Sequence, residues 1–147
     1  MVDQIFILSY NTCMIYFAYG MNTNREEMHH RCRGALSLGP AQLLGHSFRF
    51  AHHADVEPCE HSHVEGVAWR IDQYHLQALD RLEGYPWYYD RVQATICLRD
   101  RQLQAWVYRM QPGNDAALPS QHYYDTVMEG YQVHGVPTDQ LLNAVLL

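Results

Sequence analysis

The chain has 147 residues, of which 48% are hydrophobic and 18% are charged, as is typical of a soluble globular domain. A net charge of −6 argues against a general binder of nucleic acids or anionic membranes. The chain contains no lysine, which excludes a phosphate-loop lysine and any Schiff-base mechanism. No apolar run approaches the ~20 residues that a membrane-spanning helix needs.

The N-terminal segment MVDQIFILSYNTC carries an acid and no early basic cluster, so it is not typical of a secretory signal. Met14 stands directly before the first predicted strand. We therefore expect residues 1–13 to be an upstream or disordered extension and residues 14–147 to form a single domain. The cysteines are widely spaced, without a C-x-x-C pair, which favours reduced thiols and a cytoplasmic protein.

The first half of the chain is predicted to be mostly extended. Residues 15–19 form a strand, and a short helix follows over residues 24–31. The stretch GALSLGPAQLLGHSFRFAHH predicts extended segments broken by Gly39, Pro40 and Gly45. GVAWRI, residues 66–71, alternates apolar residues as a strand does. The polar stretch between them, HHADVEPCEHSH, is expected to be a solvated loop.

The second half contains two helices with clear boundary signals. One is DQYHLQALDRLEG, with Asp72 as N-cap and Gly84 after its last turn. The other begins after Ser120 and ends at Gly135, and residues 139–147 predict a last short helix. Between the two capped helices, RVQATICL and LQAWVYRM predict a hairpin around the turn RDRQ.

Strands therefore dominate the first two thirds of the chain and helices the last third. This order predicts an α+β fold, a small mixed β-barrel with flanking helices.

The stretch FAYGMNTN leaves a strand through Gly20, Asn22 and Asn24 and enters a helix. A loop of this kind exposes backbone N–H groups at a helix N-terminus and can hold an anion. Gly20 is expected to need a backbone conformation that is closed to other residues.

Glu83 falls in the last turn of the predicted helix, where the helix dipole disfavours a carboxylate by roughly 0.3–1 kcal/mol. The same interaction raises its pKa, and burial by the aromatic residues at 85–89 would raise it further. A general acid or base is tuned toward neutral pH in this way. The pattern is also that of a solvated glutamate that only ends a helix.

Two other features of the sequence allow more than one interpretation. His52, His53, Cys59, His61 and His63 cluster in the predicted loop, but their spacing matches no zinc motif, so we expect no metal. The second feature is a tyrosine, Tyr123, which falls just inside a helix N-terminus. Its hydroxyl could face a pocket, or its ring could simply pack in the core.

Three stretches together resemble the γ-glutamylcyclotransferase-like family, which includes AIG2-like and BtrG-like proteins. FAYGMNTN is similar to the family's Y-G-S-N-L loop. LDRLEGYPWYYDRV is similar to its L-D-x-x-E-G…Y-x-R-x-V pattern, and PSQHYYDTVMEGYQVHGVP to its P-S-x-x-Y…G…G-L-P ending. The three motifs occur in order across nearly the whole chain.

The resemblance implies a small mixed barrel with a pocket for a γ-glutamyl group. It implies that Tyr19, Gly20, Met21 and Asn22 form the loop that binds the head group, mostly through the backbone. Glu83 matches the family's catalytic acid/base, and Tyr123 matches a pocket tyrosine. Met21 is a departure, because the family usually has serine there.

The activity implied is the intramolecular cyclisation of a γ-glutamyl amide to 5-oxoproline with release of the amine. It needs neither cofactor nor metal, and the expected partner is a small molecule rather than a nucleic acid or a membrane. Two alternatives remain: a ligand-binding module without turnover, favoured by Met21, and a metal-binding protein that uses the histidine-rich run. The sequence indicates neither the amine nor the oligomeric state.

Overall fold

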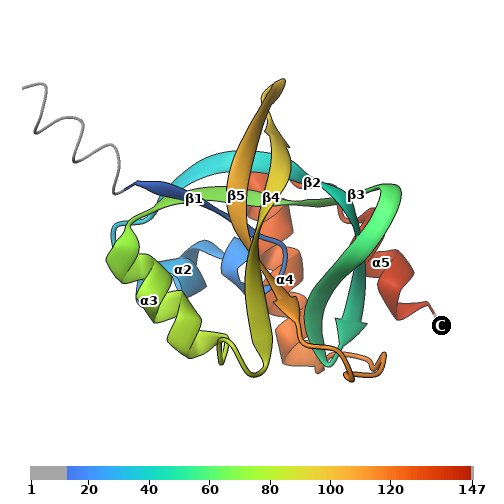
Figure 1. Ribbon diagram of the computed structural model, residues 1–147. Helices are drawn as coiled ribbons and strands as arrows, with labels where there is room; N and C mark the ends of the chain where they lie inside the picture. Colours follow the sequence, from blue (N-terminus) through green and yellow to red (C-terminus); the bar gives the residue numbers. More distant parts are fainter. Residues whose placement is uncertain (1–12, 147) are drawn as a thin grey trace, which may run out of the picture.

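A computed structural model describes residues 13–146, so all but the last residue of the predicted N-terminal extension lies outside the described residues. Figure 1 shows a barrel with helices packed around it. In chain order the elements are β1 (Met14–Ala18), the 3₁₀ helix η1 (Met21–Thr23), α2 (Arg25–Arg31), β2 (Leu36–Ala51), β3 (His53–Ile71), α3 (Gln73–Leu82), β4 (Tyr89–Leu98), β5 (Arg101–Met110), α4 (Gln121–His134) and α5 (Asp139–Val145).

Within the described residues, the strands close into one barrel in the order β1-β3-β2-β4-β5. Every neighbouring pair is antiparallel except β1 and β5, which run parallel and complete the closure. The barrel interior is filled by fully buried apolar side chains such as Phe17, Leu43, Val64 and Val107. The predicted α+β fold with a small mixed barrel is confirmed.

The long hairpin of β2 and β3 differs from the prediction. Gly39 and Gly45 do not break the chain into separate segments; they coincide with register shifts inside one continuous strand. The histidine-rich stretch that we expected to be a loop lies within β3, after a tight turn at His52. The strand is hard to see in the sequence because most of residues 57–63 project into solvent, and the apolar alternation is lost there.

The predicted hairpin of β4 and β5 is confirmed, with the turn at Arg99 and Asp100. Both residues have positive φ, 48° and 66°, so the turn adopts a left-handed conformation without glycine. The predicted caps are confirmed as well. The Asp72 side chain caps α3, the Ser120 side chain caps α4, and Gly135 ends α4 with φ of 71°.

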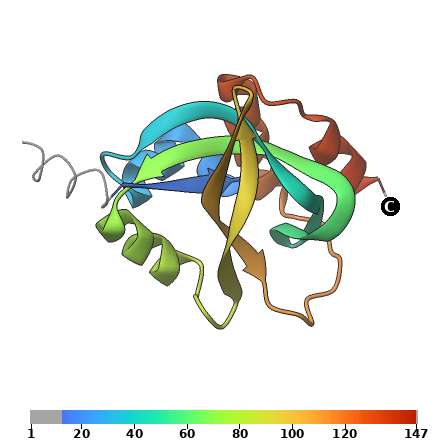
Figure 2. The same cartoon turned by 45° about the horizontal axis from the view of Figure 1, so that its top comes forward.

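The loop after β1 packs against α4. Gly130 of α4 makes this close approach possible, because a Cβ there would lie 2.7 Å from the Asn24 backbone nitrogen and would also clash with the Thr23 hydroxyl. Asn24 adds a hydrogen bond from its Nδ2 to the Thr126 carbonyl of α4. Figure 2 shows α3 and α5 at opposite ends of the molecule. None of the helices within residues 13–146 is both long and apolar enough to cross a membrane.

Candidate active site

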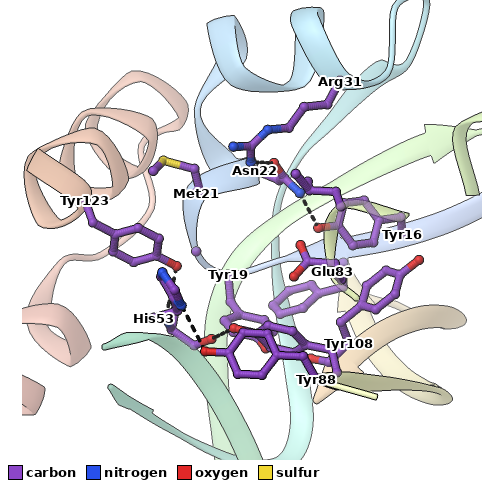
Figure 3. A pocket seen from close by; sticks show the side chains of 15 residues that line it. Tyr16, Tyr19, Met21, Asn22, Arg31, His53, Glu83, Tyr88, Tyr108 and Tyr123 are labelled. Atoms are coloured by element: carbon purple, nitrogen blue, oxygen red, sulfur yellow. Dashed lines mark hydrogen bonds between the residues drawn. The ribbon is translucent and has the colours of Figure 1, made fainter. Parts of the chain in front are cut away.

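A cavity of about 220 Å³ lies where the end of β1, the end of α3 and the start of α4 meet. Most of its wall is aromatic, and six tyrosines contribute to it. Figure 3 shows the side chains that line it, with Glu83 near the centre. Each residue singled out from the sequence lines this cavity: Tyr19, Gly20, Met21, Asn22, Glu83 and Tyr123.

Gly20 begins the loop after β1, with φ of −119° and ψ of −129°, outside the left-handed region. The expected need for a special backbone conformation stays a prediction. Space gives a separate reason for glycine. A Cβ at this position would lie 2.9 Å from the Cβ of Ala54 and 3.0 Å from the Tyr123 hydroxyl. A larger residue would therefore push the loop away from the cavity wall.

Asn22 is buried and held at both ends of its amide. Its Nδ2 donates to the Tyr16 hydroxyl at 3.0 Å, and its Oδ1 accepts from Arg31 at 2.6 Å. Arg31 also pairs with Glu27 at 3.3 Å on the same helix, α2. Met21, in contrast, directs its thioether toward α4 and away from Glu83 (Figure 3). The departure from serine therefore does not place a bulky group beside the carboxylate.

Glu83 is the C-cap residue of α3, one position beyond the predicted last turn. Its backbone N–H still donates to the Leu79 carbonyl, at 2.8 Å, so the helix geometry fixes where the side chain starts. The carboxylate makes no hydrogen bond or ion pair within the described part of the chain. Burial raises its pKa to about 7, while the positive charge of Arg31 acts in the opposite direction.

Tyr123 lies in the first turn of α4, where the Ser120 hydroxyl accepts its backbone N–H at 3.1 Å. The Tyr123 hydroxyl accepts a hydrogen bond from the Ala54 backbone N–H at 3.0 Å. Burial raises the pKa of Tyr123 to about 12, although hydrogen bonds from the backbones of Ala54 and Met21 act to lower it. The hydroxyl therefore stays protonated and lies beside the loop.

A further part of the wall is formed by His53 and by Tyr88, which belongs to the aromatic run expected to shield Glu83. His53 Nδ1 lies 2.9 Å from the Tyr88 hydroxyl, and its ring packs on Tyr123 with centroids 5.1 Å apart. Partial burial lowers the pKa of His53, and the charge of His52 acts in the same direction. Sequence reasoning missed Tyr16 and Arg31, which come from β1 and α2. Tyr16 and Arg31 meet through the amide of Asn22, a contact that no sequence motif encodes.

The arrangement provides one unpaired carboxylate that titrates near neutral pH, surrounded by hydroxyl and backbone donors. Such a group can remove a proton from a bound molecule and return it to another atom. Among residues 13–146, no group of three or more histidine, cysteine, aspartate or glutamate side chains is placed to hold a metal ion. The histidine-rich segment therefore adds one side chain, His53, to the cavity and no metal-binding cluster.

Comparison with known families gives a match over most of the domain. Residues 16–134 match the family model described as "Gamma-glutamyl cyclotransferase, AIG2-like". A solved structure named "Gamma-glutamyl cyclotransferase" superposes with a TM-score of 0.82 at 21% identity. The superposition covers 92% of this chain and 88% of that one. At this level of identity the superposition establishes a shared fold.

Two curated relatives match over shorter stretches. "Putative gamma-glutamylcyclotransferase CG2811" of Drosophila melanogaster is 35% identical over 85 residues, which is 55% of this chain and 54% of that protein. "Putative gamma-glutamylcyclotransferase MJ1514" of Methanocaldococcus jannaschii is 38% identical over 48 residues, 32% of this chain and 40% of that protein. The matched parts thus span about half, or less, of each relative.

Proposed function

The chain belongs to the gamma-glutamyl cyclotransferase, AIG2-like family, and from this premise we propose that it cyclises a γ-glutamyl amide to 5-oxoproline and releases the amine. One observation carries the proposal: the carboxylate of Glu83 is unpaired within the described residues, buried, and has a pKa of about 7. It lies in a cavity that also contains the loop of Tyr19, Gly20, Met21 and Asn22.

The reaction is intramolecular. The α-amine of the γ-glutamyl group attacks its own γ-carbonyl carbon, a C–N bond forms, and the original amide C–N bond breaks. Because nucleophile and electrophile belong to one molecule, holding that molecule in a folded conformation provides much of the rate acceleration. Two protons leave the α-ammonium nitrogen in all, one before it attacks and one after the new C–N bond has formed. The leaving amine takes up both and departs as an ammonium. In our proposal Glu83 relays these protons in turn, so its protonation state is restored at the end.

The loop and Tyr123 have a binding role in this proposal. The backbone N–H groups of Gly20 and Asn22 lie at the start of the 3₁₀ helix η1, and in our proposal they donate to an anion, whereas the Met21 backbone hydrogen-bonds the Tyr123 hydroxyl. The α-carboxylate of the γ-glutamyl group is the anion that fits the reaction. The Tyr123 hydroxyl lies against Gly20 and is placed to donate to the same carboxylate.

The chemistry needs no cofactor or metal, since a proton relay and orientation suffice. The amine side of the substrate contacts the mouth of the cavity. We propose that its specificity lies in residues 51–64 and 111–118, of which His53 and Ala54 line the cavity. A cytoplasmic location is also part of the proposal.

A second candidate function is a γ-glutamyl-binding module without turnover, and Met21 is the observation that favours it. The module would bind a γ-glutamyl compound and release no product. The direction of the Met21 side chain, away from Glu83, is the reason to prefer the enzyme (Figure 3).

A panel of γ-glutamyl compounds tests the proposal. It should include glutathione, γ-glutamyl amino acids and γ-glutamyl derivatives of simple amines, each scored for 5-oxoproline and for the released amine. We expect at least one compound to give both products in equal amounts, and none to do so with Glu83→Gln. Binding of a compound without product from any member of the panel would support the non-catalytic module instead.

A further inference from the structure

Several of the tyrosines that line the cavity use their hydroxyl protons within the protein. Tyr19 donates to the carbonyl of Tyr108 at 2.6 Å, and Tyr108 donates to the carboxylate of Asp80 at 2.7 Å. Tyr89 donates to the carbonyl of Ala54, also at 2.7 Å. These three protons have protein acceptors, so these hydroxyls are not free to donate to a bound molecule.

Tyr16 differs because its hydroxyl oxygen is an acceptor. A guanidinium has only donors, so the Asn22 atom that faces Arg31 at 2.6 Å must be the amide oxygen. This fixes the orientation of the amide, which would otherwise be ambiguous. The Nδ2 group of Asn22 then faces Tyr16 and donates to its oxygen at 3.0 Å. Arg31 thus sets the direction of two successive hydrogen bonds.

The proton of the Tyr16 hydroxyl has no acceptor among residues 13–146, although the residue is 4% exposed. A buried donor without an acceptor is unfavourable, so this proton calls for a partner that is not part of the protein. Burial raises the pKa of Tyr16, and the negative charge of Glu83 raises it further. Figure 3 shows the hydroxyl and the carboxylate facing the same space, with no hydrogen bond drawn between them.

We propose that the hydrogen-bonded series Arg31–Asn22–Tyr16 presents the Tyr16 hydroxyl as the hydrogen-bond donor to the γ-carbonyl oxygen of the substrate. This inference rests on the proposed function. As the α-amine nitrogen bonds to the γ-carbon, the carbonyl electron pair moves onto oxygen, and the Tyr16 hydrogen bond strengthens while the proton stays on Tyr16. The C=O bond re-forms when the amide bond breaks, and the leaving amine takes its proton from Glu83.

The three residues of this hydrogen-bonded series have distinct roles. Tyr16 contacts a reacting atom and is a catalytic residue, whereas Arg31 and Asn22 act through it and are positioning residues. The loop N–H groups are then left for the α-carboxylate. Two anionic groups of one substrate are thereby separated, with the carboxylate at the loop and the developing oxyanion at Tyr16.

Two substitutions test the direction of the hydrogen bonds in the series Arg31–Asn22–Tyr16. Tyr16→Phe removes the donor and leaves the ring. Asn22→Asp keeps an acceptor for Arg31 but replaces the Nδ2 donor by a second acceptor, so the Tyr16 proton turns toward the new carboxylate and away from the cavity. Tyr89→Phe is the matched control, because it removes a hydroxyl of the same wall whose proton is already used.

We expect kcat at the pH plateau to fall roughly 10²–10³-fold in Tyr16→Phe, the usual cost of losing one oxyanion donor, with KM little changed. Asn22→Asp should show a similar loss, and the double variant no further loss, because both changes remove the same hydrogen bond. Tyr89→Phe should retain most of kcat. A Tyr16→Phe variant with the kcat of wild type, or losses that multiply in the double variant, would overturn the proposal.

A binding measurement separates this proposal from the proposed function. The lactam carbonyl of 5-oxoproline carries the oxygen of the original γ-carbonyl, and L-proline lacks it. Calorimetry should show that Tyr16→Phe weakens the binding of 5-oxoproline roughly five- to tenfold and leaves the binding of L-proline unchanged. If wild type releases no 5-oxoproline from any γ-glutamyl compound, the proposed function fails and this selective loss alone decides for Tyr16. Equal changes for the two ligands, or binding of neither, would overturn the Tyr16 assignment.

Discussion

Two hollows in the molecule contain buried carboxylates and use them in opposite ways. The larger, about 360 Å³, lies beside residues 111–114 and contains Asp55. Asp55 accepts hydrogen bonds from Arg49 at 3.0 Å and from the Met110 backbone at 2.9 Å. The smaller, about 220 Å³, contains Glu83, whose carboxylate has no such partner in the described part of the chain. The size of a hollow therefore does not identify the reactive site.

The difference between the two carboxylates is one of unused hydrogen-bonding capacity. Asp55 joins β3 to β2 and β5, and Arg49 extends the link to the Asn114 carbonyl in the loop before α4. Its lone pairs are occupied by structural partners. The lone pairs of Glu83 are free for a bound molecule, and its burial raises its pKa, which the charge of Arg31 offsets only in part. Stability and reactivity thus place opposite demands on a buried carboxylate.

The largest effect that we expect is on turnover. Glu83→Gln keeps the shape of the side chain and removes the proton acceptor, so kcat should fall roughly 10²–10⁴-fold, the usual range for a general acid or base. Release of 5-oxoproline measures it. Glu129→Gln, which neutralises an exposed carboxylate on α4 that lines neither hollow, is the control and should retain full activity. An active Glu83→Gln variant would remove the distinction between the two carboxylates.

The pH dependence of stability should also reveal the titration of the Glu83 carboxylate. Its pKa is about 7 in the folded protein and 4.5 ordinarily, so between these values the folded state binds more protons than the unfolded state. The free energy of unfolding should therefore fall as pH rises through this window, by at most about 3 kcal/mol, because the carboxylate still faces the cavity.

Urea unfolding at pH 5 and pH 8 measures this contribution. Glu83→Gln lacks the titration, so at pH 8 it should be more stable than wild type, and the two proteins should differ less at pH 5. Equal stability of the two proteins at both pH values would mean that Glu83 is solvated rather than buried.

Asp55→Asn should show the converse behaviour. The change removes the charged partner of Arg49 and replaces one buried hydrogen-bond acceptor by a donor. We therefore expect a loss of about 1–3 kcal/mol in stability. The kcat per folded molecule should fall far less than in Glu83→Gln, because Asp55 does not line the cavity. Urea midpoints and active-site-normalised rates measure both quantities. A variant with normal stability but no turnover would contradict the structural role.

The smallest effect concerns Tyr123. Tyr123→Phe removes a hydroxyl that accepts from the Ala54 backbone and lies over the loop. A pocket hydroxyl should lose roughly 0.5–1.5 kcal/mol in kcat/KM. Thermal unfolding of the same variant is the control, since a purely packing residue would lose activity only in step with stability. Such a proportional loss would mean that Tyr123 only packs in the core.

Local signals in the sequence predicted much of the fold. Asp72, Ser120 and Gly135 occupy the cap positions expected of them, because caps depend on a few neighbouring residues. The long hairpin of β2 and β3 was harder to predict. In its outer part the consecutive residues 57–61 are all exposed, and the bulges of β2 disturb the alternation on which strand prediction depends.

The candidate site could be predicted only in part. Glu83 and Gly20 stand in recognisable local contexts, a helix end and a strand-to-helix loop. Tyr16 and Arg31 carry no such context, because their role arises from the amide of Asn22 that lies between them. Contacts of this kind follow from side-chain packing, which no short pattern encodes.

The most direct test of the role of Glu83 is the pH profile of kcat/KM, which reports the ionisation of the free enzyme. With a substrate from the panel, wild type should show an ascending limb with a midpoint near 7, the pKa of buried Glu83. The residual activity of Glu83→Gln should lack that limb. A limb at the ordinary carboxyl value of 4.5, or the same limb in the variant, would contradict Glu83 as the group that transfers the proton.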